Sequence, residues 1–215
     1  MNAHVERSAK NLLALSEEKT AFDKAILEWQ FEGNITDHEA PTEMCELCEQ
    51  EGVRYHFEIR NALGNVLQVG STCIDKFDIQ VLDEAGNEVL GNKKAYLANL
   101  VKRRHRVKVM DALFATKHQG KLADYSKADL DEHCYVCIVQ ENSWDFRVLR
   151  YVFKRFEEEG MAFDPKAFSI PSDNSSVRTD LLRLKRIQFE RIRGALSKKQ
   201  RDLWLSAKGK GGDKE

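Results

Sequence analysis

With 215 residues, 42% of them hydrophobic and 32% charged, the chain has the composition of a soluble protein with one sizeable core or two small ones. No run approaches the roughly 20 apolar residues of a membrane helix, and the first residues lack the apolar core of a secretion signal, so a cytoplasmic protein is expected. The formal net charge of −1 hides an asymmetry: residues 1–91 carry 7 Lys and Arg against 18 Asp and Glu, and residues 92–215 carry 27 against 17.

The first segment, residues 5–31, is predicted to form one amphipathic helix. Its apolar residues recur at spacings of three, four or seven and form a single stripe: Leu12, Leu15, Phe22, Ile26 and Trp29. Residues 33–42 are polar and acidic, and Pro41 blocks helix continuation, so a linker is expected there.

Residues 45–73 carry the strongest chemical signal in the chain. A Cys-x-x-Cys turn, Cys45 and Cys48, directs both sulfurs at one centre. The following residues alternate like a half-buried strand, and a turn around Gly64 reverses the chain and returns Cys73 to the first two thiols. Three converging thiols predict a tetrahedral zinc site, which needs one more N or S donor.

Several residues are candidates for the fourth zinc ligand. His56 lies between the knuckle and Cys73 and is the first choice, and His38 is another option. Cys134 and Cys137 form a second Cys-x-x-Cys, and either of them could close the site from a distance in sequence. The alternative interpretation is that the thiols are reduced, buried apolar side chains, which does not explain their spacing.

Three strings in this region carry a resemblance to a known group of proteins. They are Cys45-x-x-Cys48, Arg-Tyr-His-Phe-Glu-Ile-Arg-Asn at 54–61 and Val-Gly-Ser-Thr-Cys-Ile-Asp-Lys-Phe at 69–77. Together they resemble the zinc-ribbon-like hairpin of small bacterial, plasmid and phage proteins that are mostly uncharacterised. The similarity extends upstream through Trp29 and Asp37. It implies a zinc hairpin in a nucleic-acid-related or mobile-element context and no named activity.

Downstream of the zinc motif, the patterns predict one more hairpin and then mostly helices. The hairpin covers residues 79–90 and turns near Gly86. Helices are expected over residues 93–117, from Ser126 onward, over 144–159, over 177–194, and from a Ser197–Gln200 capping box through Trp204. The run 134–140 fits a buried strand equally well, because periodicity cannot decide for so short a segment. Residues 118–126 and 162–176 are expected to be a loop and an ordered connector.

The expected fold class is therefore α+β and rich in helix. Residues 1–91 would hold the N-terminal helix and a zinc-ribbon-like β-hairpin module, and residues 92–206 a basic, mostly α-helical region. The segment 207–215 has no apolar content apart from its first alanine and is expected to be a disordered tail.

Two clusters of basic residues are candidates for binding DNA or RNA. From Arg178 to Arg201 there are nine Lys and Arg against two acids, and a second cluster runs from Lys102 to Lys108. Cations on a helix can neutralise phosphates and release counterions. The candidate nucleic-acid-binding residues are Lys102, Arg103, Arg104, Arg106, Arg183, Arg186, Arg193, Lys198 and Lys199.

Other interpretations of these cations stay open. They can simply face water, pair with the acidic N-terminal half, or bind an acidic protein partner. Phe189 and Trp204 lie among them and could stack on bases or belong to the core. The knuckle itself has six carboxylates and no Lys or Arg between Asp37 and Glu51, so we expect it to have a structural role or to present a surface to a protein.

The sequence lacks the common signatures of catalysis. It contains no phosphate-binding loop of the form G-x-x-x-x-G-K-[ST], no G-x-G-x-x-G after a strand and no H-E-x-x-H. The full His-x-Glu … Pro-Cys-x-x-Cys signature of the zinc deaminases is also absent. The favoured hypothesis is thus a zinc-containing, non-catalytic accessory protein that binds nucleic acid. The alternative is a protein-binding adaptor or inhibitor encoded by a mobile element, acting through the acidic N-terminal half.

Overall fold

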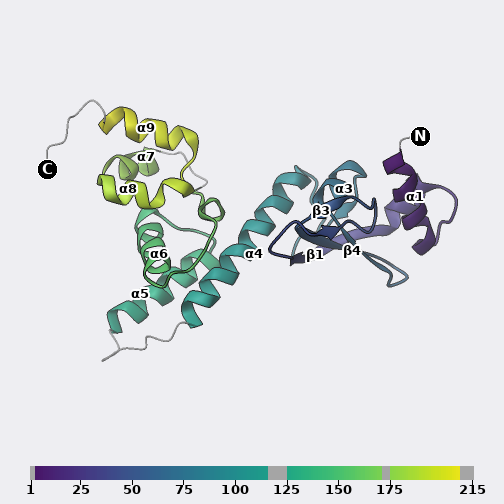
Figure 1. Ribbon diagram of the computed structural model, residues 1–215, viewed down its shortest axis with the longest axis horizontal. Coiled ribbons are helices and arrows are strands. Elements are labelled where there is room, and N and C mark those ends of the chain that lie inside the picture. The colour runs from purple at the N-terminus through teal and green to yellow at the C-terminus, as the bar shows by residue number, and fades with distance from the viewer. Residues whose placement is uncertain (1–2, 116–124, 171–174, 209–215) are drawn as a thin grey trace. The chain divides into compact units, whose positions relative to one another are not determined.

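The computed structural model describes residues 3–115, 125–170 and 175–208, which form two compact units, Met1–Val101 and Lys102–Glu215 (Figure 1). The change of unit lies inside helix α4 (Lys93–Ala115), not at the change of charge near residue 91. The reason is that α4 contributes to two separate cores: Leu97 packs in the first, and Met110 and Leu113 pack in the second. None of the helices in the described ranges is both long and apolar enough to cross a membrane.

The first unit is built on a four-stranded sheet in the order β5-β4-β1-β6. Its strands are β1 (Trp29–Asp37), β4 (Tyr55–Asn61), β5 (Val66–Val69) and β6 (Gln80–Val81). Strand β4 pairs antiparallel with β1 and β5, and β6 pairs parallel with β1. A second, two-stranded sheet consists of β2 (Glu43–Met44) and β3 (Glu51–Val53).

The prediction of one helix over residues 5–31 is wrong. Helix α1 ends early (Ala3–Leu15), and it is followed by the short helix α2 (Phe22–Ala25) and a 3-10 turn, η1 (Ile26–Glu28). Trp29 and Phe31 are buried while Gln30 and Glu32 are not, a period of two that belongs to a strand. The first half of the expected linker over 33–42 is strand, since β1 continues to Asp37 opposite Tyr55, and the strand-free part begins at residue 38.

The hairpin of β4 and β5 is confirmed, together with its turn. Asn61 and Asn65 close the turn, and Gly64 between them has φ +82, a conformation that glycine adopts at little cost. After β5 the chain enters helix α3 (Ser71–Lys76). Cys73 therefore lies in the first turn of a helix, so the zinc-ribbon-like module is shown only as a knuckle and a hairpin. Of the second hairpin expected over residues 79–90, the structure has the tight turn, which is closed by the hydrogen bond from Asp83 N–H to the carbonyl of Asn87.

The regular elements described in the second unit are all helical. After α4 come α5 (Tyr125–Tyr135), the π-helix η2 (Val136–Gln140), α6 (Phe146–Glu158) and the 3-10 turn η3 (Pro165–Phe168). The end of the chain forms α7 (Ser175–Leu182), α8 (Arg186–Ile192), the 3-10 turn η4 (Arg193–Ala195) and α9 (Lys198–Lys208). The second Cys-x-x-Cys is therefore helical rather than a strand. Most of the predicted loop 118–126 lies outside the described residues.

The single helix predicted over 177–194 is broken into two. Lys185 is extended, with ψ 158, and its backbone N–H donates to the side chain of Gln188 at 2.9 Å, which caps the start of α8. The break lets Leu181, Leu184 and Phe189 all turn into the core. The capping box predicted for the last helix is confirmed, because Ser197 N–H donates to Gln200 Oε1 (2.9 Å) and Gln200 N–H donates to Ser197 Oγ (3.2 Å).

Candidate metal centre

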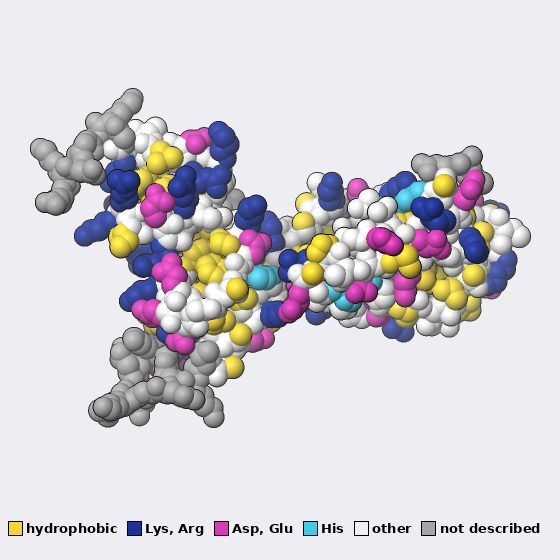
Figure 2. All heavy atoms as spheres, in the orientation of Figure 1, with side chains coloured by type: hydrophobic (Ala, Val, Ile, Leu, Met, Phe, Trp, Pro, Cys, Tyr) yellow, Lys and Arg dark blue, Asp and Glu magenta, His cyan; other side chains and the backbone are white. Residues whose placement is uncertain are grey.

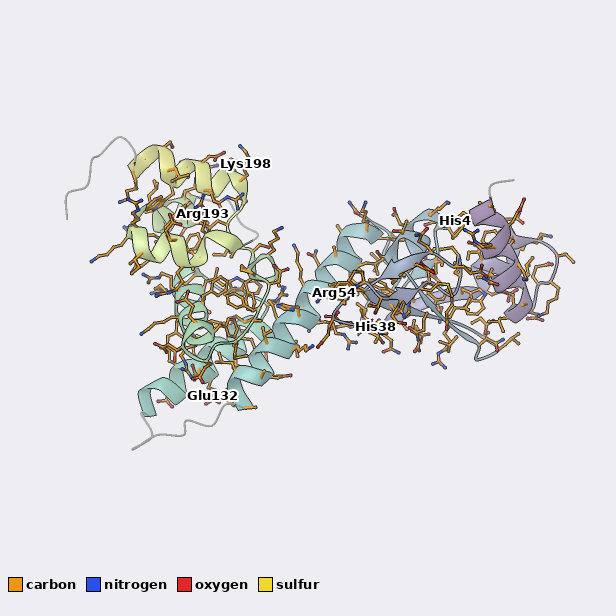
Figure 3. The ribbon with its side chains drawn as sticks, in the orientation of Figure 1. His4, His38, Arg54, Glu132, Arg193 and Lys198 are labelled. Carbon is orange, nitrogen blue, oxygen red and sulfur yellow. The ribbon has the colours of Figure 1, made fainter. Side chains whose placement is uncertain are left out.

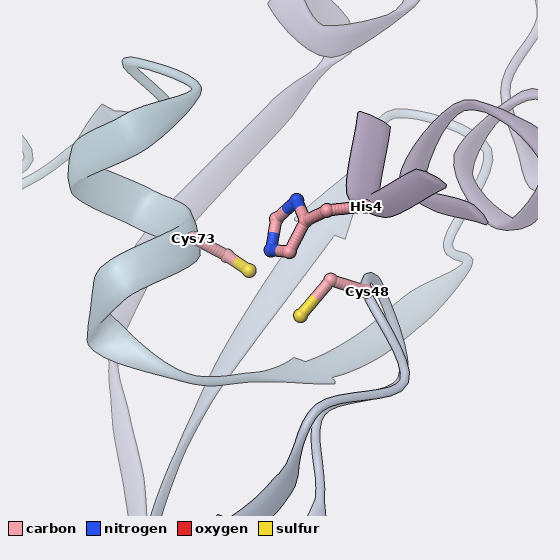
Figure 4. Close-up of side chains that lie close together, drawn as sticks. All are labelled: His4, Cys48 and Cys73. Carbon is pink, nitrogen blue, oxygen red and sulfur yellow. The ribbon is translucent and has the colours of Figure 1, made fainter. Parts of the chain in front are cut away.

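The first unit brings three cysteines and one histidine together. The ligand atoms of His4, Cys48 and Cys73 lie within 4.8 Å of one another (Figure 4). Cys45 joins them, since its Sγ lies 3.7 Å from Sγ of Cys73. Two sulfurs bound to one tetrahedral Zn²⁺ at about 2.3 Å would lie about 3.8 Å apart. The cluster can therefore hold a metal ion with little rearrangement of the thiols.

The knuckle that carries Cys45 and Cys48 is held by its own small sheet. Strands β2 and β3 flank it, Cys45 N–H donates to the carbonyl of Gln50 (2.9 Å), and Glu49 N–H donates to the carbonyl of Cys45 (2.8 Å). Cys73 approaches from the other side, in the first turn of α3, where its N–H donates to the carbonyl of Gly70. All three thiols are buried, so the protein excludes water from most of the site.

His4 comes from helix α1, whose polar face packs on the knuckle. Arg7 Nε donates to the carbonyl of Cys48 (3.1 Å), and Asn11 Nδ2 donates to the carbonyls of Glu46 and Leu47 (3.2 Å each). His4, Arg7 and Asn11 are spaced i, i+3 and i+7, so they share one face of the helix. These contacts place His4 beside the thiols without help from a metal.

The imidazole of His4 is oriented by two neighbours. Its ring stacks on Phe77 with centroids 5.7 Å apart, and Lys76 Nζ lies 3.1 Å from Nδ1. A neutral imidazole carries one proton, so binding a metal through Nε2 requires that proton on Nδ1 and a shift of the Lys76 ammonium away from it. In Figure 4 the other ring nitrogen points toward the two sulfurs. Partial burial lowers the pKa of His4, and the charges of Lys76 and Arg7 lower it further. The neutral imidazole that results is the form that binds a metal.

Hydrogen bonds favour a thiolate at Cys45. The Cys73 thiol and the backbone N–H groups of Gly70, Cys48 and Leu47 bond to its sulfur, and they lower the pKa of Cys45 to about 5 despite burial. The Gly70 N–H lies 3.4 Å from that sulfur. In the same pair the pKa of Cys73 is raised, because its proton is shared with Cys45 and burial disfavours a second charge. A divalent cation would relieve this competition by accepting both sulfurs as thiolates.

The structure places the predicted fourth ligand elsewhere. His56 Nδ1 lies 3.1 Å from His38 Nε2, and His56 Nε2 lies 3.1 Å from the carbonyl of Met44, so both of its ring nitrogens are engaged. Figure 3 shows His4 and His38 on different parts of the first unit. The fourth donor next to the thiols is therefore His4, and neither His56 nor His38 takes that place.

The second Cys-x-x-Cys belongs to the helical core of the other unit. Cys134 is buried there among apolar side chains, which raises its pKa to about 12. Cys137 lies one turn after His133, and its Sγ is 3.6 Å from His133 Nε2. Burial, with the charges of Glu141 and Asp145, raises the pKa of Cys137 as well. The first unit supplies four donors without either cysteine.

The candidate nucleic-acid-binding residues differ in accessibility. Arg183 and Lys198 have 76% and 85% of their side chains exposed, and Arg186, Arg193 and Lys199 are also exposed. Dark blue basic side chains gather over α7, α8 and α9 in Figure 2, and Figure 3 marks Arg193 and Lys198 among them. In α4, Arg104 is exposed while Lys102 and Arg103 are half-buried. These exposed and half-buried cations therefore remain candidates for binding nucleic acid.

Arg106 is the exception and is removed from that set. It is buried, its guanidinium lies 4.8 Å from the centroid of the Trp144 ring, and it donates to the carbonyl of Ala167 (2.7 Å) and to Asn142 Oδ1 (2.6 Å). Burial, together with the positive charge of Arg103, lowers the pKa of Arg106 to about 10. Met110 and Leu113 of α4 are buried in the core of the second unit, and Arg106 lies on the same face of the helix. It is a structural residue of the second unit.

Phe189 and Trp204 are also core residues. Their rings stack on each other with centroids 3.9 Å apart and an interplanar angle of 7°, and both are buried. Trp204 Nε1 donates to the carbonyl of Leu184 (3.3 Å), so its polar atom is engaged too. The stacked rings of Phe189 and Trp204 pack α8 against α9, and because both are buried they are not available to stack on bases.

Comparison of the chain with protein-family models, with curated proteins and with solved structures found no match.

Proposed function

We propose that this is a zinc-containing protein whose metal is structural and whose basic helices α7–α9 bind nucleic acid. The observation that carries the zinc assignment is the proximity of the donors: the ligand atoms of His4, Cys48 and Cys73 lie within 4.8 Å of one another, and Cys45 Sγ lies 3.7 Å from Cys73 Sγ. Three thiolates and one imidazole are a common donor set for structural zinc, whereas Ca²⁺ and Mg²⁺ prefer oxygen ligands. With four protein donors the coordination sphere is complete, which leaves no position for a catalytic water.

The role of the metal follows from where its ligands come from. Cys45 and Cys48 belong to the knuckle, Cys73 to α3 and His4 to α1. A metal bound to all four joins three segments that are far apart in the sequence. Zinc binding would add to the folding free energy of the unit, because the four donors are brought together only in the folded chain.

Nucleic-acid binding is proposed from the exposed cations of the second unit. The ion pairs that link Arg183 to Asp180, Arg193 to Glu190 and Lys198 to Asp202 are all between residues three or four positions apart on exposed helix faces. Such pairs contribute about 0.3–0.5 kcal/mol and exchange readily with other anions. Arg186 is exposed and has no ion-pair partner among the residues that the structure describes. Phosphates can therefore compete for these side chains at little cost.

A salt series tests the nucleic-acid assignment. The full chain is titrated with a labelled 20-mer duplex and with the corresponding single strands, at about 50 and 200 mM salt, by fluorescence anisotropy. The triple variant Arg183→Glu, Arg186→Glu, Arg193→Glu should abolish binding and leave the zinc content unchanged. The matched control Lys10→Glu, Lys19→Glu, Lys24→Glu makes the same change in net charge on the first unit and should retain binding. Absence of binding at low salt, or equal loss in both variants, would contradict the proposal.

A second function, binding of a protein through the acidic N-terminal half, is favoured by one feature of the first unit. Next to α3 and the start of α4 there is a hollow lined by carboxylates and an exposed leucine.

A further inference from the structure

Two sulfurs of the metal centre lie close enough to be joined to each other directly. Cys45 Sγ and Cys73 Sγ are 3.7 Å apart, and both cysteines are free and buried. A disulfide needs about 2.05 Å between its sulfurs, so this pair would have to approach by about 1.7 Å. Small rotations of the two side chains, with a slight shift of the short helix α3, supply that movement. The same sulfurs can therefore serve either a metal ion or a disulfide.

The segment before α3 holds Cys73 at Cys45. Gly70 N–H lies 3.4 Å from Cys45 Sγ, and Cys73 N–H donates to the carbonyl of Gly70 at 2.9 Å. Two contacts of the Cys45 sulfur thus come from residues 70–73. This arrangement needs no metal, so the pair stays together when the site is empty.

The knuckle is the fixed side of this pair. Its backbone is held on both sides of Cys48, by the hydrogen bond from Cys45 N–H to the carbonyl of Gln50 (2.9 Å) and by the one from Arg7 Nε to the carbonyl of Cys48 (3.1 Å). Cys73 is carried by a helix of six residues and approaches from the other side. For this reason the expected partner of Cys45 is Cys73 and not its neighbour Cys48.

His4 is the way in for an oxidant. The three thiols are at most 2% exposed, whereas His4 is half-buried and is the only one of the four donors in contact with solvent to that extent. When the His4 side chain moves, a molecule as small as hydrogen peroxide can reach the sulfurs. Larger oxidants, such as oxidised glutathione, need a wider opening.

We propose that a peroxide converts Cys45 and Cys73 into a reversible disulfide, and that this disulfide and a bound metal ion exclude each other. It is a means of regulating the metal centre, so it rests on the proposed zinc site.

The reaction takes two electrons from the two sulfurs. The Cys45 sulfur attacks one peroxide oxygen, the O–O bond breaks, and hydroxide leaves and is protonated to water. The Cys73 sulfur then attacks the sulfur of the resulting sulfenic acid, the S–O bond breaks, and the second oxygen leaves as water with the Cys73 proton. Two thiols and one hydrogen peroxide thus give one disulfide and two waters. Attack in the opposite order gives the same product.

Oxidation leaves Cys48 and His4 as donors. If each of the four donors supplies an equal share of about 10–16 kcal/mol, the loss of two lowers zinc affinity at least about 10⁴-fold. Helix α3 stays tied to the knuckle by the disulfide, while His4 and α1 lose their link through the metal. A dithiol reductant should reverse both changes.

The test locates the disulfide in the full chain. The chain is freed of metal under a reductant, separated from both reagents and treated with hydrogen peroxide, with and without zinc. Free thiols are blocked with N-ethylmaleimide, and the chain is digested with trypsin without reduction. We expect residues 25–54 joined to residues 61–76 through Cys45 and Cys73, located by fragmentation mass spectrometry, and loss of this product when zinc is bound.

Zinc release is the second measurement, and it needs no variant. Peroxide added to the zinc-loaded chain beside a chromophoric chelator should release zinc in step with the disulfide, and dithiothreitol should restore binding. The same oxidation in urea gives the distribution of disulfides in the unfolded chain, which should be a mixture.

Matched variants separate this pair from the other thiols. Cys48→Ser should keep the disulfide, Cys73→Ser should abolish it, and Cys137→Ser in the second unit should change nothing. A disulfide mainly between Cys45 and Cys48, the same mixture with and without urea, or an oxidised chain that keeps its zinc affinity would overturn the proposal. A reduced chain that takes up no zinc would instead refute the zinc site itself.

Discussion

Replacing His4 by alanine removes one of the four donors of the proposed zinc site and leaves the other contacts of α1 in place. Arg7 and Asn11 still bind the carbonyls of the knuckle. Structural zinc sites contribute about 10–16 kcal/mol in total, so an equal share for each of four ligands is about 2.5–4 kcal/mol. By the usual conversion this lowers zinc affinity about 10²–10³-fold. Cys73→Ser should lower it at least as much, because a thiolate is lost.

The affinity is measured by competition with a chromophoric chelator at pH 7, with metal content determined on the same samples. His56→Ala is the informative comparison, since its ring binds His38 and Met44 and is not directed at the thiols. It should leave zinc affinity unchanged even if the free energy of unfolding falls. His133→Ala, in the second unit, controls for loss of a histidine as such. If His56→Ala weakened zinc binding while His4→Ala did not, the assignment of the fourth ligand would be wrong.

The remaining predictions concern the second unit. Arg106→Met should lower the free energy of unfolding by about 2–3 kcal/mol, because the carbonyl of Ala167 and the side chain of Asn142 lose a charged donor. Urea denaturation measures this free energy. The control Arg104→Met, at an exposed position of the same helix, should change it by less than about 0.5 kcal/mol. Asp145 caps α6, and although partial burial would raise its pKa, hydrogen bonds from Val148 and Arg147 lower it overall. The stabilisation that this carboxylate provides is thus present above the ordinary Asp pKa and is lost as pH falls through the lowered value. Asp145→Asn, which still caps but does not titrate, should reduce the loss of stability between pH 5 and pH 2; an unchanged acid profile would argue against this role.

The local motifs of the first unit could be predicted from the sequence. The Cys-x-x-Cys knuckle and the hairpin with its turn at Gly64 are short-range patterns, and the hairpin is what returns Cys73 to the knuckle 28 residues later. Short-range patterns of this kind determine where a chain reverses, and so three of the four donors of the site follow from them. The capping box at Ser197 was predictable for the same reason.

What only the tertiary structure decided is which faces of distant elements meet. His4 is 41 positions before Cys45, and nothing in its own segment shows that the polar face of α1 packs on the knuckle. Arg106 looked like one more surface cation, but the direction of α4 places it over Trp144. Sequence periodicity predicts that a helix has a polar and an apolar face. Which segment each face contacts depends on burial and hydrogen bonding with residues far away in the sequence. The fourth ligand and the buried arginine both depend on that second kind of information.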